Sequence, residues 1–148
     1  MKSLFAAVAV AAALLPLSSH AQFAKPEDAI KYRQSAYTVL GAHFGRLGAM
    51  VNGRIPYDAK LASYNASLVS TLAHLPGPAF GPGTESGLNT RAKAEIWKEP
   101  AKFQAAYDKM VDATSKLPAA AGDPAALKAA FGTAAATCKG CHDDFRRE

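Results

Sequence analysis

The chain has 148 residues, of which 49% are hydrophobic and 20% charged, and its formal net charge is +5. This length suits one domain with one hydrophobic core. The positive charges are spread along the chain without the Lys/Arg run that follows a phosphate backbone, which argues against nucleic acid as a partner. A mildly basic surface is compatible with an acidic protein partner.

The first residues have the pattern of a targeting segment. A basic start precedes an apolar run over residues 4–15, and Ser19-His20-Ala21 offers small residues where signal peptidase cleaves. We predict a cleaved signal peptide over residues 1–21, a mature domain over residues 22–148 and a periplasmic location. A membrane anchor, the alternative, would need about 20 apolar residues. No later segment is apolar enough to span a membrane, so we expect no membrane insertion after cleavage.

Four segments of the mature chain have apolar residues at alternating steps of three and four, which is typical of helices. The first follows Pro26, the second begins near Asp58, the third opens at Glu99-Pro100 and the fourth at Asp123-Pro124. The positions expected to face inward are Ile30, Arg33, Tyr37, Leu40, Phe44, Leu47 and Val51, then Leu61, Asn65, Leu68, Leu72 and Leu75, then Phe103, Tyr107, Met110, Thr114 and Leu117, and finally Leu127, Phe131, Ala134, Cys138, Cys141 and Phe145.

A long connection, residues 79–99, separates the second and third of these segments. Connections of this length are uncommon in a compact domain unless they have a function. We expect its aromatic residues Phe80 and Trp97 to pin it to the bundle. No run of alternating strands is visible, so we predict an all-α fold, an antiparallel four-helix bundle with a long crossover loop between helices 2 and 3.

The last helix contains Cys138-Lys139-Gly140-Cys141-His142, a C-x-x-C-H sequence typical of c-type haem attachment. The two thiols lie one helical turn apart, so each can add to one of two neighbouring vinyl groups on the same porphyrin edge. The adjacent imidazole then falls beneath the ring, where its nitrogen can reach the iron. The motif predicts one covalently bound haem c per chain, attached through Cys138 and Cys141, with His142 as the axial ligand of the iron.

Other interpretations of the cysteine pair stay open. Two cysteines in an exported protein commonly form a disulfide. A C-x-x-C pair can also be a redox dithiol, although the βαβ setting of such sites is missing here. A zinc site would need four ligands, so His43 or His74 would have to join the cysteines. The position of both cysteines on the inward side of a helix in an exported chain favours haem.

Only residues 143–148 follow the motif, whereas most small cytochromes c carry it near the N-terminus. A C-terminal motif on the last helix of a bundle resembles the cytochrome c′ family, the class II cytochromes c. The matching segments are Gln22–Ala29, Lys31–Ala36, His43–Arg46, Ala79–Thr84, Glu95–Trp97 and Ala129–Gly132. The resemblance implies a homodimer, five-coordinate high-spin haem iron with an apolar distal pocket, and binding of NO and CO but not O₂.

Particular residues are expected around the haem. A buried Arg33 needs a partner, which a haem propionate would provide, unless its head reaches solvent at the bundle end. By the resemblance, Tyr37 takes the place of the side chain that faces the vacant iron position and would have to swing aside for a ligand, unless it is a packing aromatic with its hydroxyl at the surface. The resemblance also implies that Arg146 lies beside the proximal face, unless it is a solvated charge. Candidates for the apolar wall, or for ordinary packing, are Leu40, Phe80 and Trp97.

A sixth protein ligand is not expected. Met50 lies about 20 Å along the helix from Tyr37, and Met110 matches the family's sixth-ligand position poorly, so both are expected in the core. We therefore expect a binding protein, not an enzyme, that captures diatomic gas, mainly NO and also CO. The alternative is an electron carrier in periplasmic redox chains, guided to an acidic partner. Catalysis lacks support because no distal His–Arg pair or second redox centre is visible.

Overall fold

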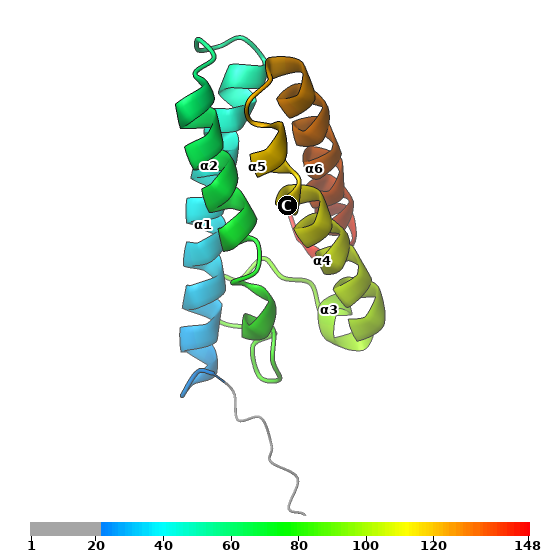
Figure 1. Ribbon diagram of the computed structural model, residues 1–148. Coiled ribbons are helices and arrows are strands. Elements are labelled where there is room, and N and C mark those ends of the chain that lie inside the picture. The colour runs from blue at the N-terminus through cyan, green and yellow to red at the C-terminus, as the bar shows by residue number, and fades with distance from the viewer. Residues whose placement is uncertain (1–21) are drawn as a thin grey trace, which may run out of the picture.

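The computed structural model describes residues 22–148, and the predicted signal peptide lies outside them. Four long helices run antiparallel and side by side (Figure 1), namely α1 Pro26–Val51, α2 Ala59–Leu72, α4 Pro100–Ser115 and α6 Pro124–Phe145. Short helices lie in the connections, namely η1 Gly77–Ala79, α3 Glu95–Lys98 and α5 Leu117–Ala120. The predicted all-α bundle with a long crossover between its second and third long helices is confirmed. Between residues 22 and 148, no helix is both long and apolar enough to span a bilayer.

Local chemistry fixes where the long helices begin. The Asp58 and Asp123 carboxylates accept hydrogen bonds from the backbone N–H of Leu61, at 2.8 Å, and of Ala126, at 2.6 Å, which caps α2 and α6. A proline stands in the first turn of α1, α4 and α6, where a missing N–H costs nothing. These are the starts that the sequence predicts.

The inward face of α2 differs from the predicted one. Leu61, which the leucine spacing places inside, is 43% exposed. The buried residues of this helix are Ala62, Asn65, Ala66 and Val69. The polar Asn65 is satisfied there, because its amide nitrogen donates to Leu61 O at 2.7 Å and its Oδ1 pairs with His43 Nδ1 at 2.8 Å. Small side chains and one hydrogen-bonded amide therefore decide how α2 meets α1.

Two apolar clusters fill the bundle. The first contains Leu47, Met50, Ala62, Ala66, Val69, Ala113, Leu117, Ala121, Leu127 and Ala134. The second contains Leu40, Ala73, Ile96, Phe103, Tyr107, Met110 and Phe145, with Cys138 and Cys141 packed against it. Contact between α1 and α6 depends on Gly48, where a Cβ atom would lie 2.9 Å from the Phe131 ring. The two motif cysteines thus border the second cluster, beside the crossover connection.

Helix α2 ends at Leu72, so Leu75, which the sequence pattern predicts to be helical, already belongs to the crossover connection. One buried side chain, Arg33, anchors this connection. Arg33 is 2% exposed. Its Nη1 donates to Ala79 O and Thr84 Oγ1, both at 2.9 Å, and its Nη2 donates to Thr84 O at 2.7 Å and Thr90 Oγ1 at 3.0 Å. Four hydrogen bonds from one guanidinium hold the long connection against α1.

The far end of the same connection is paired with the end of α6. Ala92 forms an antiparallel bridge with Arg146, and the Arg147 backbone N–H donates to Arg91 O at 2.8 Å. The chain just after the C-x-x-C-H motif is thereby fixed to a loop that is about 50 residues away in sequence. This pairing places loop residues beside the motif.

Candidate functional site

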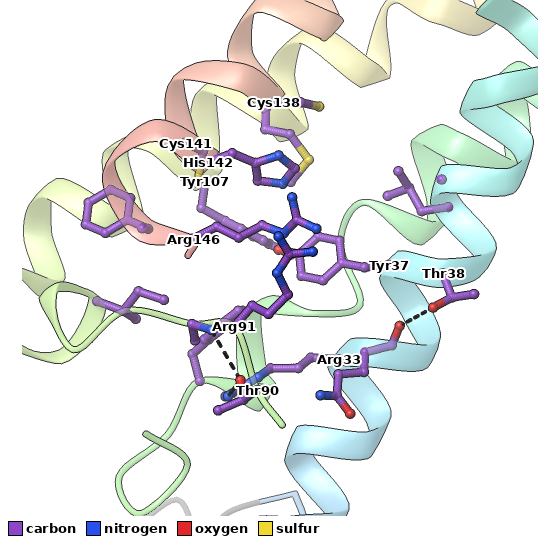
Figure 2. Close-up of a pocket in the computed structure, with 18 of the residues that line it drawn as sticks. Arg33, Tyr37, Thr38, Thr90, Arg91, Tyr107, Cys138, Cys141, His142 and Arg146 are labelled. Atoms are coloured by element: carbon purple, nitrogen blue, oxygen red, sulfur yellow. Dashed lines mark hydrogen bonds between the residues drawn. The ribbon is translucent and has the colours of Figure 1, made fainter. Parts of the chain in front are cut away.

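A cavity of about 520 Å³ opens between α1, α4, α6 and the crossover connection. Figure 2 shows Cys138, Cys141 and His142 on α6, with Tyr37 on α1 pointing into the same space. The apolar part of the remaining lining comes from Leu40, Phe44, Phe80, Ala92, Ile96, Phe103, Met110 and Phe145. The motif and the inward side of the first helix therefore share one hollow.

The two cysteines are free, half-buried thiols. Burial raises the pKa of the Cys138 thiol, and burial together with the neighbouring Cys138 raises the pKa of Cys141 to about 11. Both thiols therefore stay protonated near neutral pH. A redox-active dithiol depends on a lowered thiol pKa, so this environment does not suit that chemistry.

The His142 imidazole borders the cavity next to two arginines. Burial lowers its pKa, and the positive charges of Arg146 and Arg91 lower it too, against the opposing effect of Asp143. The neutral imidazole is therefore favoured. That is the form in which histidine binds a metal.

The zinc alternative finds no support in the part of the chain that the structure describes. No three His, Cys, Asp or Glu side chains gather there closely enough to hold a metal ion. His43 pairs with Asn65 between α1 and α2, and His74 is exposed, so neither joins the cysteines. Two thiols and one imidazole around a large apolar hollow fit a bulky apolar cofactor held covalently better than a bare ion.

Tyr37 lies on α1 one helical turn after Arg33, with its ring in the cavity. Burial raises the pKa of its phenol, and Tyr107 and the two motif cysteines raise it further, so the hydroxyl stays neutral. Across residues 22–148 the hydroxyl has no hydrogen-bond partner within the protein. It is therefore available to a molecule inside the cavity.

Arg33 also lines the cavity, but its guanidinium already has partners. Both terminal nitrogens are used by the crossover connection, and the side chain is buried rather than turned to solvent. The structure therefore gives Arg33 backbone and hydroxyl partners in the place where the sequence analysis put a haem propionate.

Two of the three predicted wall residues, Leu40 and Phe80, line the cavity, whereas Trp97 does not. The Trp97 indole Nε1 donates to Phe80 O at 2.9 Å and to Gly81 O at 3.2 Å. These bonds hold its ring behind Phe80, with the ring centroids 6.2 Å apart. The expectation for Trp97 needs correction, because its polar N–H draws it to the loop backbone.

Sequence reasoning missed the part of the lining that comes from the crossover connection, namely Asn89, Thr90, Arg91, Ala92 and Ile96. Arg91 is the one charged side chain among these five. Nothing in the periodicity marks it, because it reaches the cavity only through the pairing of its segment with residues 145–147. A basic residue in an unusually long connection was the sole available signal.

A helical bundle whose last helix presents a C-x-x-C-H motif to an apolar cavity defines a c-type haem protein of the bundle class. A sequence profile described as Cytochrome C' matches residues 28–146. The chain therefore belongs to the cytochrome c′ family, as the resemblance predicted. Proteins of this family carry covalently bound haem c, which is accordingly the cofactor of this chain.

Individual relatives agree with this assignment. The chain is 54% identical over 129 residues to cytochrome c′ of Rubrivivax gelatinosus, covering 86% of this chain and 100% of that protein. It is 50% identical over 129 residues to cytochrome c′ of Alcaligenes xylosoxydans xylosoxydans, covering 86% and 99%. The crystal structure of the Rubrivivax gelatinosus protein matches with a TM-score of 0.83, at 54% identity, over 85% of this chain and 100% of that one. A nitric oxide complex of a mutant of the Alcaligenes xylosoxidans protein matches with a TM-score of 0.80, at 49% identity, over 86% and 99%.

Proposed function

We propose that this chain is a periplasmic monohaem cytochrome c′ whose five-coordinate haem binds diatomic gas, mainly NO and also CO. Cys138 and Cys141 would hold the haem through two thioether bonds, and His142 would be the one protein ligand of the iron. When bound, the haem supplies an iron that exchanges diatomic ligands. Solved relatives include a nitric oxide complex of a mutant and a carbon monoxide complex of a variant of cytochrome c prime from Alcaligenes xylosoxidans, which supports this proposal.

The observation that carries the proposal is the contrast between the cavity walls. The α6 wall offers a neutral imidazole, whereas the α1 wall offers Tyr37, Leu40, Gly41 and Phe44. Apart from the phenol, none of these four has an atom that ligates iron. A haem held on α6 would therefore face a crowded but unligated distal side.

One methionine does line the cavity. Met110 comes from α4 and is buried in the apolar cluster that includes Phe103 and Tyr107. This helix packs against α6, which bears the cysteines. Met110 therefore does not belong to the α1 wall that Tyr37 occupies, and we propose that it packs against the haem rather than ligating the iron.

Two side chains would adjust ligand access on opposite faces of the haem. Tyr37 fills distal space, so a diatomic has to displace its ring, while its free hydroxyl can donate to what binds. Arg146 is exposed and close enough to His142 to lower the pKa of the imidazole. We propose that it limits solvent access on the proximal side.

An electron carrier is the alternative function, and one observation favours it. A second hollow reaches the surface beside Cys138 and His142. Its charged lining residues are the basic Arg91, Lys93, Lys139, Arg146 and Arg147 and the acidic Asp143 and Glu148. A haem edge exposed there would sit in surroundings with a basic excess, which suit an acidic redox partner.

The homodimer and the periplasmic location belong to the same proposal. Val39 on α1 and Leu61 and Tyr64 on α2 are 46%, 43% and 59% exposed, and these helices pack against each other. Large apolar side chains at such a surface favour a contact with a second copy. The predicted signal peptide over residues 1–21 supports export.

Absorption spectra of the oxidised, reduced and CO-treated holoprotein test the proposal, together with the mass of the secreted chain. We expect the mass of one haem, high-spin spectra in both redox states, and rapid reaction of the ferrous protein with NO in stopped flow. Absence of any reaction with NO would remove gas capture. A low-spin, six-coordinate spectrum would favour the electron carrier, and absence of haem mass would remove both functions.

A further inference from the structure

The lining of the cavity is cationic. Arg33, Arg91 and Arg146 line it, and among the residues of the 22–148 region that do so there is no aspartate or glutamate. Figure 2 shows Arg33 and Thr90 on the side of the cavity away from Cys138, with Arg91 and Arg146 between them and His142. Positive charges gathered in an apolar hollow call for an anionic group in the occupant.

Arg33 is not available to that group. Its Nη1 and Nη2 each donate two hydrogen bonds to the crossover connection, and the side chain is almost fully buried. A propionate that used these nitrogens would have to displace bonds that fix residues 79–90. This side chain holds the loop, and its charge is already partly compensated by the oxygen dipoles around it.

The position of Arg146 in the chain places its side chain near His142. It follows the last residue of α6, four residues beyond His142, and its charge acts on the imidazole. It also lines the surface hollow beside His142. Arg91 lines the same hollow and also acts on the imidazole. Arg146 differs from Arg91 in its position one helical turn after His142, which places it beside the proximal ligand.

Arg91 is anchored at its stem and free at its tip. Its Nε donates to Arg147 O at 3.0 Å, and its backbone O accepts from the Arg147 N–H at 2.8 Å. Over residues 22–148, the two Nη nitrogens of Arg91 have no hydrogen-bond partner. Figure 2 shows the side chain pointing into the cavity. The backbone pairing therefore presents a fork of free donors at the end of the cavity where the crossover connection meets the chain after α6.

The separation between this end and the cysteines fits the chemistry of haem. Phe145, where the loop pairing begins, lies seven residues past Cys138 on α6, which is about 10 Å at 1.5 Å per residue. The vinyl groups of haem lie on two neighbouring pyrrole rings and the propionates on the other two. Thioethers at Cys138 and Cys141 therefore direct the propionates away from the cysteines, toward the crossover connection.

We propose that Arg91 binds a haem propionate through its free Nη nitrogens, and that Arg33 instead anchors the loop that carries Arg91. The inference rests on the attachment through Cys138 and Cys141 proposed above. A guanidinium pairs with a carboxylate through two parallel charge-assisted hydrogen bonds. The neighbouring cations are already engaged, because Lys93 Nζ donates to Asp143 O at 2.8 Å and Arg147 Nη2 donates to Thr90 O.

Arg91→Gln in the haem-loaded protein tests the assignment. We expect the propionate bending band in the resonance Raman spectrum to shift, because the carboxylate loses a charged donor. We also expect the midpoint potential to fall, since an uncompensated propionate favours ferric iron. Arg54→Gln is the matched control, because Arg54 is exposed after α1 and does not line the cavity. It removes the same charge and should leave both readouts unchanged.

Arg91→Lys separates charge from geometry, since lysine keeps the charge without the fork. We expect its midpoint potential to lie between those of the unchanged protein and Arg91→Gln, with a smaller shift of the band. An unchanged propionate band in both haem-loaded Arg91 variants would overturn the assignment. So would a shift of the iron–histidine stretching band alone, which would place Arg91 on the His142 side. Absence of haem mass from the unchanged protein would overturn the attachment itself, and this inference with it.

Discussion

Arg33 Nη2 lies 3.0 Å from Thr90 Oγ1, which joins the first long helix to the crossover connection. The backbone carbonyl of the same threonine accepts a hydrogen bond from Arg147 Nη2. Thr90 is therefore hydrogen-bonded both to α1 and to the chain that follows α6. Tyr37 lies one helical turn after Arg33, and His142 lies five residues before Arg147. The hydrogen bonds of Thr90 therefore connect the α1 side of the site to the α6 side.

Replacement of Arg33 tests how much its hydrogen bonds to the crossover connection stabilise the fold. Arg33→Gln should lower the free energy of unfolding by about 2–4 kcal/mol, because buried oxygens of Ala79 and Thr84 lose their charged donor. Urea unfolding of the haem-loaded protein measures the change. Arg54→Gln serves as the exposed control, with an expected change within about 0.5 kcal/mol. An equally small loss for Arg33→Gln would show that the loop is held by other contacts.

Tyr37→Leu should speed CO association and tighten CO binding, by up to about tenfold. The expected size follows from the cost of turning the ring off its preferred rotamer, about 0.5–1.5 kcal/mol. Flash photolysis and CO titration of the ferrous protein give both quantities. Tyr37→Phe keeps the bulk and removes the hydroxyl, so it shows which of the two matters. Unchanged CO affinity and association rate in Tyr37→Leu would mean that Tyr37 is not the gate.

Met110→Leu should leave the ferric and ferrous absorption spectra unchanged. Met110 lies in the apolar cluster of α4, and leucine fills a similar volume at a cost below about 1.5 kcal/mol. Met50→Leu, in the other apolar cluster, is a control of the same chemistry away from the cavity. A change from a low-spin to a high-spin spectrum in the Met110 variant would identify its sulfur as an iron ligand and contradict the five-coordinate proposal.

The buried phenol of Tyr107 should make the protein less stable at alkaline pH. Its hydroxyl donates to Ala73 O at 2.6 Å and accepts from the Gly77 N–H at 2.9 Å. Tyr107→Phe should therefore cost about 1–3 kcal/mol at neutral pH, as both loop groups lose their partner. Burial raises the pKa of the Tyr107 phenol, so the folded protein keeps a proton that the unfolded chain releases near pH 10.

The sign of the pH effect follows from that difference in bound protons. Above about pH 10 the unfolded chain binds fewer protons than the folded one, so stability falls as pH rises. Urea unfolding at a series of alkaline pH values measures the slope, which should be shallower in Tyr107→Phe. An identical slope in the two proteins would mean that Tyr107 titrates alike when folded and unfolded.

Features of local origin could be predicted from the sequence. The helix starts at Asp58 and Asp123 depend on a side chain and an N–H three residues away, and the C-x-x-C-H motif depends on one helical turn. The family resemblance was likewise readable, because its segments are continuous stretches of sequence. These features need no knowledge of what lies across the bundle.

The tertiary structure alone decided which distant groups meet. Arg33 finds acceptors 46 to 57 residues away, and Arg91 reaches the cavity because its segment pairs with the chain after α6. Trp97 turns behind Phe80 to satisfy its N–H, and α2 buries alanines in place of Leu61. In each case a buried polar group or a close helix contact had to be satisfied in three dimensions. Periodicity along the chain carries no information about such partners.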